Sequence, residues 1–306
     1  MQTKKPELKT DIAWNTALKS WSHPSIPRVI ITKKPEDIQN LKKGIAQSLQ
    51  EELAFMKYPE FQTYANLENI SEKFPEDTQR GLTAILKHEV GHRFCPFDST
   101  TAIILNHAIE KELAGEELPY DLKASSRLIL NLFTDMCINT RISRSLDKDI
   151  VWAYQELNKK NRTTKLWKVY TRSMELAWNE KIFQEDSQIT GEEQKAAEEL
   201  TALFEKNFFD RSRWQDTTRK YAKIIKKFLE NFKKDRECSL DDITANIPSE
   251  IDEKTATELA KRLAEIGSSG LPTNASGLKE FKEIMAGFGH GDEKKASVMF
   301  YDVLSN

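Results

Sequence analysis

The stretch Ala124–Leu146, ASSRLILNLFTDMCINTRISRSL, decides the fold. It predicts a helix over about 124–145 that is apolar on nearly every side, so this helix has to lie largely inside the protein. Its apolar side chains are Leu128, Ile129, Leu130, Leu132, Phe133, Met136, Cys137, Ile138 and Ile142. Asn131, Asp135 and Asn139 recur at every fourth position and form one polar stripe. A buried carboxylate is costly unless a cation, hydrogen bonds or a metal ion compensates its charge. The stripe therefore predicts a polar site inside an apolar core.

The rest of the chain also favours helices. Glycine (11) and proline (10) are sparse among the 306 residues, while Leu, Lys, Glu and Ala are plentiful. We expect helices over about 35–56, across 150–236 and near 253–266. Another helix is expected to begin near Glu76 and to end no later than Pro96, and the next to run from Asp98 or Ser99 to Gly115. The tryptophans of the later helices, at positions 152, 167, 178 and 214, are expected to anchor the core.

One strand is expected, at Arg28–Thr32, where RVIIT is rich in β-branched residues. A single strand is unstable alone, so it needs partners that are less obvious in the sequence. The segment 57–77 contains two prolines and is interpreted as mostly connection. The predicted fold class is mainly α with a minor β element. We expect a core over 1–148 and a helical C-terminal region over 149–306, which can also be continuous with the core.

Charge and cysteine usage narrow the class of protein. Lys plus Arg (46) nearly balances Asp plus Glu (48), which gives no net field for binding nucleic acid or an anionic membrane. The cysteines at positions 95, 137 and 238 form no CxxC pair, which favours a reducing compartment. The N-terminus lacks the apolar core of a signal peptide, and no apolar run reaches the ~18 residues of a membrane span. We therefore expect a cytoplasmic protein that binds neither membrane nor nucleic acid.

A second motif, HEVGH at positions 88–92, lies in the helix that precedes Pro96. Histidines four residues apart project from one face of a helix, so His88 and His92 can bind one ion. Glu89 lies about 100° around the helix from His88 and can reach a water molecule at the ion without being a ligand. A zinc ion there would activate water, and the glutamate would take its proton. By chance alone, fewer than about 0.01 such matches are expected in a chain of this composition.

The surroundings of the motif fit this interpretation. Leu82, Leu86 and Val90 form a core stripe along the helix, and Gly81, Ala84 and Gly91 lie close to the histidine side. The small residues are expected to leave space for a metal ion and a substrate, and Gly91 is expected to allow close packing, because glycine otherwise costs a helix about 1 kcal/mol.

The motif needs a third protein ligand, for which there are three candidates. Asp98 follows His92 by six residues, the spacing of metzincin-like sites, but Cys95 stands where those sites have a glycine, and Asp98 is also explained as a helix N-cap. Glu112 follows His92 at a separation typical of thermolysin-like sites, but it is one of several acids expected to face solvent. Asp135 is favoured because it lies in the buried helix, where zinc would compensate its charge. Asn131 and Asn139 would then orient the ligands or the substrate.

A helix with HExxH followed by a helix with NxxxDxxxN resembles the zincin-like metallopeptidase domains that are encoded beside, or fused to, von Willebrand A and MoxR-type ATPase proteins. The resemblance covers roughly residues 80–145. It implies a zincin-like core, Zn²⁺ held by His88, His92 and Asp135, and Glu89 as the catalytic base in peptide-bond hydrolysis. It also implies a protein or peptide substrate and an AAA-type ATPase or von Willebrand A protein as partner. The alternative is a non-catalytic or regulatory zinc-binding module of such an assembly.

Two further histidines are weaker candidates. His107, on the helix between the two motifs, is interpreted as a packing residue rather than a substrate donor. His290 lies in the loop GFGHGDE, where histidines are common without a function.

Overall fold

The computed structural model describes residues 8–57, 60–96, 99–145, 147–159, 164–183, 189–205, 208–231 and 234–235. Over these residues the chain is mainly helical with one small sheet, in agreement with the predicted class. The predicted helix near 253–266, Asp98, Cys238 and His290 lie outside the described residues. Within the described part of the chain, no helix is both long enough and apolar enough to cross a membrane.

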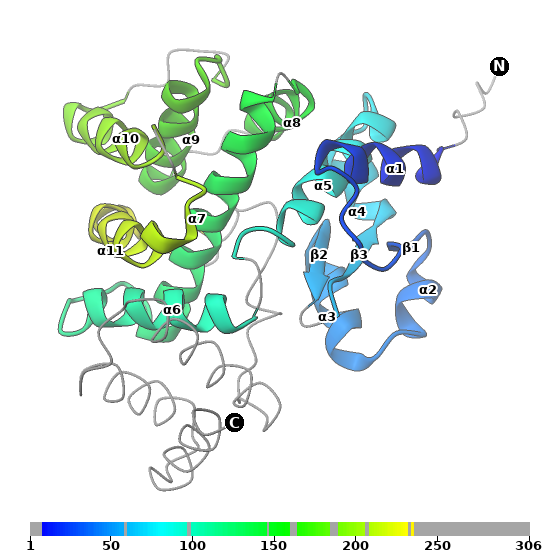
Figure 1. Cartoon of the computed structure of the whole chain (residues 1–306), viewed down its shortest axis with the longest axis horizontal. Helices are drawn as coiled ribbons and strands as arrows, with labels where there is room; N and C mark the ends of the chain where they lie inside the picture. The colour runs from blue at the N-terminus through cyan, green and yellow to red at the C-terminus, as the bar shows by residue number, and fades with distance from the viewer. Residues whose placement is uncertain are drawn as a thin grey trace, which may run out of the picture.

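The first part of the chain builds the sheet and the helices around it (Figure 1). The strands are β1 (Ile30–Thr32), β2 (Ala54–Lys57) and β3 (Gln62–Asn66). The central strand β3 pairs in parallel with β1, opposing Ala65 to Ile31, and antiparallel with β2, opposing Tyr64 to Phe55. The accompanying helices are α1 (Thr10–Ser20), α2 (Pro35–Gln39), α3 (Lys43–Glu51) and α4 (Leu67–Lys73).

Two sequence predictions in this part are wrong. The helix expected over 35–56 is divided into α2 and α3, and its last residues form β2, because the buried Ala54–Met56 gain pairing with β3. The segment 57–77 contains β3 and α4 rather than mostly connection. Asn66 starts α4, since its side chain accepts hydrogen bonds from the backbone N–H groups of Glu68 and Asn69.

The helices that follow agree with the sequence more closely. Asp77 caps α5 by accepting from the backbone N–H of Arg80, and Asp121 caps α7 by accepting from that of Ala124. The bounds are α5 (Thr78–Gly91), α6 (Ser99–Leu113) and α7 (Leu122–Arg144). The last elements are α8 (Asp149–Asn158), α9 (Lys165–Trp178), α10 (Gly191–Leu203), η1 (Arg211–Arg213), α11 (Trp214–Ile225) and η2 (Lys226–Phe228).

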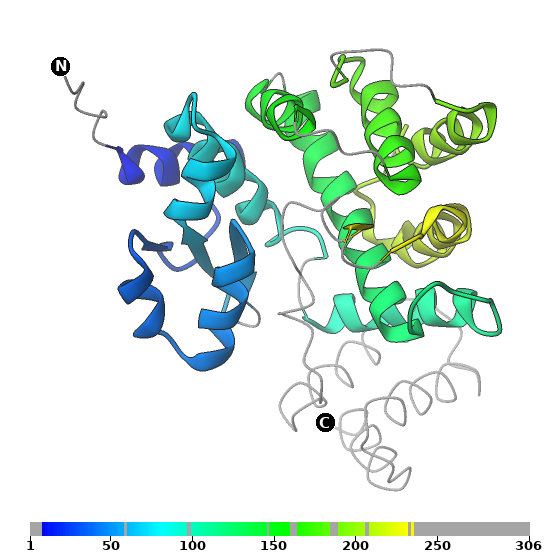
Figure 2. The same ribbon diagram turned by 180° about the vertical axis from the view of Figure 1, so that it is seen from behind.

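Helix α7 occupies the middle of the molecule, as its apolar sequence predicts. It lies between α5 on one side and α9 and α11 on the other (Figures 1 and 2), and it also contacts α6 and α8. One apolar core extends from Ala13 in α1 to Leu229 after η2. Trp167, Trp178 and Trp214 are buried in it, and the partly buried Trp152 packs against it.

Candidate metal centre

The two sequence motifs meet where α5 packs against α7. His88 lies in the last turn of α5, His92 is the residue that ends this helix, and Asp135 lies near the middle of α7. Gly91 allows the close approach, because a Cβ atom there would lie 2.4 Å from Ile138 Cγ2 and 2.8 Å from Trp21 Cζ2. The space beside this glycine is thus filled by neighbouring side chains, and it leaves no room for a substrate.

The three side chains converge on one point. His88 Nε2 lies 3.2 Å from His92 Nε2, and Asp135 Oδ1 lies 3.5 Å and 3.9 Å from these two nitrogens. The imidazole planes are nearly perpendicular, at 89°. Ligand atoms around a tetrahedral zinc ion with bonds of ~2.0–2.1 Å are separated by ~3.3 Å. The spacing of the three atoms is therefore close to that of a zinc site, and this buried group can bind a metal ion.

Hydrogen bonds at the far side of each imidazole orient its Nε2 atom. His88 Nδ1 lies 2.8 Å from Asn139 Oδ1, and His92 Nδ1 lies 3.1 Å from the Cys95 carbonyl oxygen. Both partners accept through an oxygen atom, so each Nδ1 is the donor of this bond, and each Nε2 is the ring atom that a metal ion would bind. Metal-binding histidines commonly make this second hydrogen bond.

The centre is fully enclosed. The exposed fraction is 0% for His88, Glu89, Asp135 and Asn139, and 1% for His92. A carboxylate in such a place loses its hydration, and a divalent cation is an effective replacement. Burial therefore favours metal binding, but it also means that a substrate can reach the centre only after part of the protein moves.

The remaining predicted residues have different positions. Glu89 is buried in the same turn of α5 as His88. Asn139 contacts His88 directly, whereas Asn131 is buried one turn before Asp135; the roles of both in orienting ligands stay predictions. Among the described residues, Glu112 does not belong to the group that can share an ion. His107 Nδ1 lies 4.0 Å from Glu110 Oε2 on the same helix, α6.

Cys95 and Cys137 are buried thiols close to the centre. Burial raises the pKa of the Cys95 thiol well above its usual value, and the contact with Cys137 raises it further. A protonated, buried thiol is a poor nucleophile and a poor metal ligand. Cys95 contributes to the centre through its backbone oxygen, which contacts His92 Nδ1. Sequence motifs do not reveal a backbone contact of this kind.

Sequence reasoning also missed Tyr154, on α8. Its hydroxyl oxygen lies 3.1 Å from Asn139 Nδ2 and accepts a hydrogen bond from it. No spacing or motif in the sequence connects Tyr154 with the centre, because the contact depends on how α8 folds back against α7.

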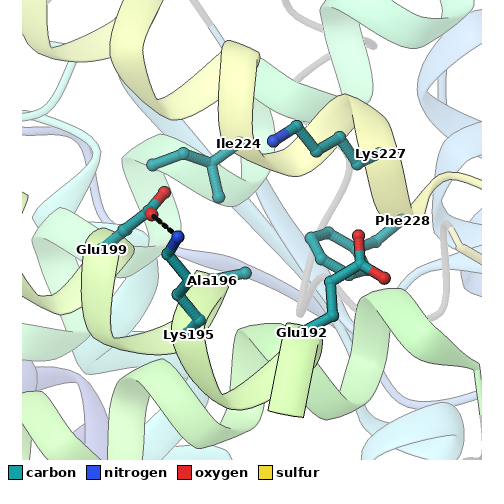
Figure 3. Close-up of a pocket in the computed structure, with 7 residues that line it drawn as sticks. All are labelled: Glu192, Lys195, Ala196, Glu199, Ile224, Lys227 and Phe228. Atoms are coloured by element: carbon teal, nitrogen blue, oxygen red, sulfur yellow. Dashed lines mark ion pairs between the residues drawn. The ribbon is translucent and has the colours of Figure 1, made fainter. Parts of the chain in front are cut away.

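A surface hollow between α10 and the end of α11 shares no residue with the centre (Figure 3). Its charged side chains include the exposed pair Lys195 and Glu199, 4.0 Å apart. Exposed pairs of this kind contribute little binding energy, and we assign the hollow no function.

No protein-family model, curated protein sequence or solved structure matches this chain. The resemblance to zincin-like metallopeptidase domains therefore stays a prediction. The functional interpretation depends on the convergence of His88, His92 and Asp135.

Proposed function

We propose that this protein is a zinc-dependent metallopeptidase with a zincin-like core. The observation that carries the proposal is the convergence of two imidazole Nε2 atoms and one carboxylate oxygen, on a helix in which the residue after His88 is the buried Glu89. Two nitrogens and one oxygen are a ligand set typical of catalytic zinc sites, in which three protein ligands leave one position open.

The ligand roles follow from the hydrogen bonds described above. His88 and His92 would bind the ion through Nε2, since their Nδ1 atoms are held by Asn139 and by the Cys95 carbonyl. Asp135 would supply the third ligand atom. When bound, zinc supplies Lewis-acid activation of water at neutral pH and stabilises negative charge in the transition state.

Glu89 is the residue to which we assign proton transfer. Its carboxylate is buried and belongs to the residue after His88, and in the proposed reaction it would take a proton from water and deliver it to the leaving amine. The substrate would be a protein or peptide. The family resemblance further supports an AAA-type ATPase or von Willebrand A protein as partner.

The direct test combines zinc content with a Glu89→Gln variant of the full chain. Wild-type protein should contain about one zinc ion, and the variant should retain it while losing cleavage of an unstructured protein substrate, by about 10²–10⁴-fold for a general base. Equal cleavage by both proteins would rule out the peptidase assignment. A chain that binds no stoichiometric zinc would instead be a helical adaptor.

The complete burial of the ligands favours a second candidate function, in which the ion stabilises a regulatory or interaction module of an ATPase-linked assembly. Structural zinc sites are closed, whereas catalytic sites keep an open position. This candidate predicts that zinc binds and stabilises the fold, that no cleavage occurs, and that Glu89→Gln has no effect on the biological role.

A further inference from the structure

We propose that this protein binds an acidic segment of a partner protein on a surface where two arginines lie over a row of aromatic rings. This arginine surface consists of Trp21, Phe94, Arg141, Arg144, Phe208 and Phe209. The inference goes beyond the proposed function, because binding at this surface requires no metal ion.

The aromatic row brings together three parts of the chain that are far apart in sequence. Trp21, which ends α1, stacks on Phe94, which follows α5, with 5.1 Å between the ring centroids and 13° between the planes. Phe209, shortly before η1, lies 6.2 Å from Trp21 and 5.9 Å from Phe208, again between centroids. The row therefore exists only in the folded chain.

The two arginines lie one turn apart at the end of α7 and face these rings. The Cζ atom of Arg141 lies 5.9 Å from the centre of the Trp21 ring and 5.6 Å from that of Phe209. The Cζ atom of Arg144 lies 5.0 Å from the centre of the Phe208 ring. A cation within about 6 Å of a ring centre is attracted to the ring. The rings therefore order the guanidinium groups before a partner binds, which lowers the entropic cost of binding.

The charge of Arg141 is available to a partner. By contrast, Arg80 also packs over a tryptophan ring, but its guanidinium pairs with Asp149 at 2.8 Å. Arg141 is exposed, and no acidic side chain in the described part of the chain forms an ion pair with it. Burial lowers the pKa of Arg144, and the charge of Glu205 partly offsets this effect. Because Glu205 also acts on Arg144, the test relies on Arg141.

The helix dipole explains only part of this arrangement. Arg141 and Arg144 lie at the C-terminal end of α7, where a positive charge is favourable. The dipole does not account for the aromatic ring that each guanidinium faces. A stacked guanidinium keeps its planar N–H fork for a carboxylate or a phosphate. The geometry thus indicates a ligand with planar or tetrahedral anionic groups.

The aromatic side chains favour a protein as the source of the anionic groups. Arginine and aromatic residues are enriched at the centres of protein–protein interfaces. Phe94, Phe208 and Phe209 are half-buried and pack against the core, so they present apolar area beside the positive charge. A nucleic-acid surface has a longer basic stripe, whereas these two arginines occupy one turn of a helix. Glutamate or aspartate side chains of a protein partner fit this combination.

The experiment measures binding of a fluorescein-labelled peptide of ten glutamates to the full chain by fluorescence anisotropy at low salt. Wild-type protein should bind the peptide. Arg141→Ala should weaken binding at least about 5-fold, the effect of an interface residue that contributes substantially to affinity. Arg141→Lys should weaken binding as well, because lysine keeps the charge but lacks the planar fork.

Two further variants separate the arginine surface from general charge. The double variant Lys220→Ala, Lys223→Ala removes two exposed charges one turn apart on α11 and should bind the peptide nearly as wild type does. Phe209→Leu removes a ring that Arg141 faces, leaves every charge in place, and should weaken binding. Urea unfolding identifies any variant that does not fold. Arg141→Lys, at an exposed position, keeps the test decisive if Phe209→Leu is such a variant.

The remaining outcomes overturn the proposal. The arginine surface is not an acidic-segment site if wild-type protein does not bind the peptide, or if the lysine variant loses as much affinity as Arg141→Ala. Unchanged binding by Arg141→Lys would show that charge alone acts. A ten-residue thymidine oligonucleotide that binds more tightly than the peptide, and loses affinity in Arg141→Ala, would reassign the surface to nucleic acid. None of these measurements tests zinc binding or cleavage, so the proposed function stands or fails separately.

Discussion

At the scale of single residues, the centre combines groups that are costly to bury separately. Asp135 is a fully buried carboxylate, and the two imidazoles lie 3.5 Å and 3.9 Å from its Oδ1 atom. Neutral imidazoles do not compensate a negative charge as an ion does. The protein therefore gains most from the side chain of Asp135 when a metal ion is bound.

Replacement of Asp135 by Asn should lower zinc affinity by at least about 10-fold, the lower end of the effect of even an outer ligand-orienting group. Isothermal titration of metal-free protein measures the change. Glu112→Gln is the matched control, because this carboxylate lies on α6 outside the ligand group and should leave the affinity unchanged. If Glu112→Gln lowers the zinc affinity and Asp135→Asn does not, Glu112 is the third ligand. If neither variant changes the zinc affinity, Asp98 becomes the candidate.

Zinc should also stabilise the folded protein, because the three ligand atoms are close together only in the folded chain. A site present only in the native state adds about 2.7 kcal/mol to the free energy of unfolding when free zinc is 100 times Kd. Thermal unfolding with and without zinc measures this increase. The increase should disappear in His88→Ala and persist in Glu89→Gln, and an equal increase in all three proteins would place the ion elsewhere.

At the scale of elements, the contact between α5 and α7 determines whether the three candidate ligands meet. The nearest side-chain atoms to a Cβ at Gly91 belong to Ile138 on α7 and Trp21 after α1, and Trp21 also donates from its indole N–H to the Lys87 carbonyl oxygen. Any larger residue at position 91 would push the helices apart. His88 and His92, on one helix, would then move away from Asp135 on the other.

Gly91→Ala should therefore destabilise the protein by about 1–3 kcal/mol through overpacking, although alanine favours a helix by about 1 kcal/mol. Zinc affinity should fall with it. Gly44→Ala, in α3, has no atom within 4 Å of the new Cβ and should be neutral or slightly stabilising. Urea unfolding measures both changes, and equal stabilities of the two variants would contradict the packing argument.

The same elements show what the sequence could predict. The buried helix α7 and the capped helix α5 were predictable because their apolar patterns and caps are local. The strands β2 and β3 were not predictable, since Ala54–Met56 become a strand only by pairing with β3.

In the centre, Asn139 was predictable from its spacing to Asp135. The Cys95 carbonyl and Tyr154 were not, because a backbone atom carries no motif and α8 reaches the centre only through the tertiary fold.

At the scale of the whole molecule, a group of buried and partly buried charges connects the candidate metal centre with α8. Lys87, the residue before His88, is 5% exposed. Its Nζ atom lies 2.5 Å from Asp147 Oδ2 and 2.8 Å from Asp149 Oδ2. Arg80 also pairs with Asp149, at 2.8 Å, and its guanidinium packs over the Trp152 ring at 4.7 Å. These ion pairs hold the start of α8 against α5, and so they fix the helix on which Tyr154 lies.

The ion pairs predict how stability depends on pH. Burial alone would raise the pKa of Asp149, but hydrogen bonds and charges from Lys87 and Arg80 outweigh burial and hold the pKa below its usual value. A carboxyl group whose pKa is lower in the folded than in the unfolded state stabilises the protein above the unfolded value, about 3.9. This stabilisation is lost as the pH falls through the folded value.

The difference in unfolding free energy between metal-free wild type and Asp149→Asn should therefore be largest near neutral pH, shrink as the pH falls below about 4, and vanish below the folded pKa. Urea unfolding between neutral and acidic pH measures it. Asp216→Asn removes an exposed partner of Lys220 and should change stability by no more than about 0.5 kcal/mol at any pH. A constant difference between wild type and Asp149→Asn would show that Asp149 acts through shape rather than charge, and that α8 is held against α5 by packing alone.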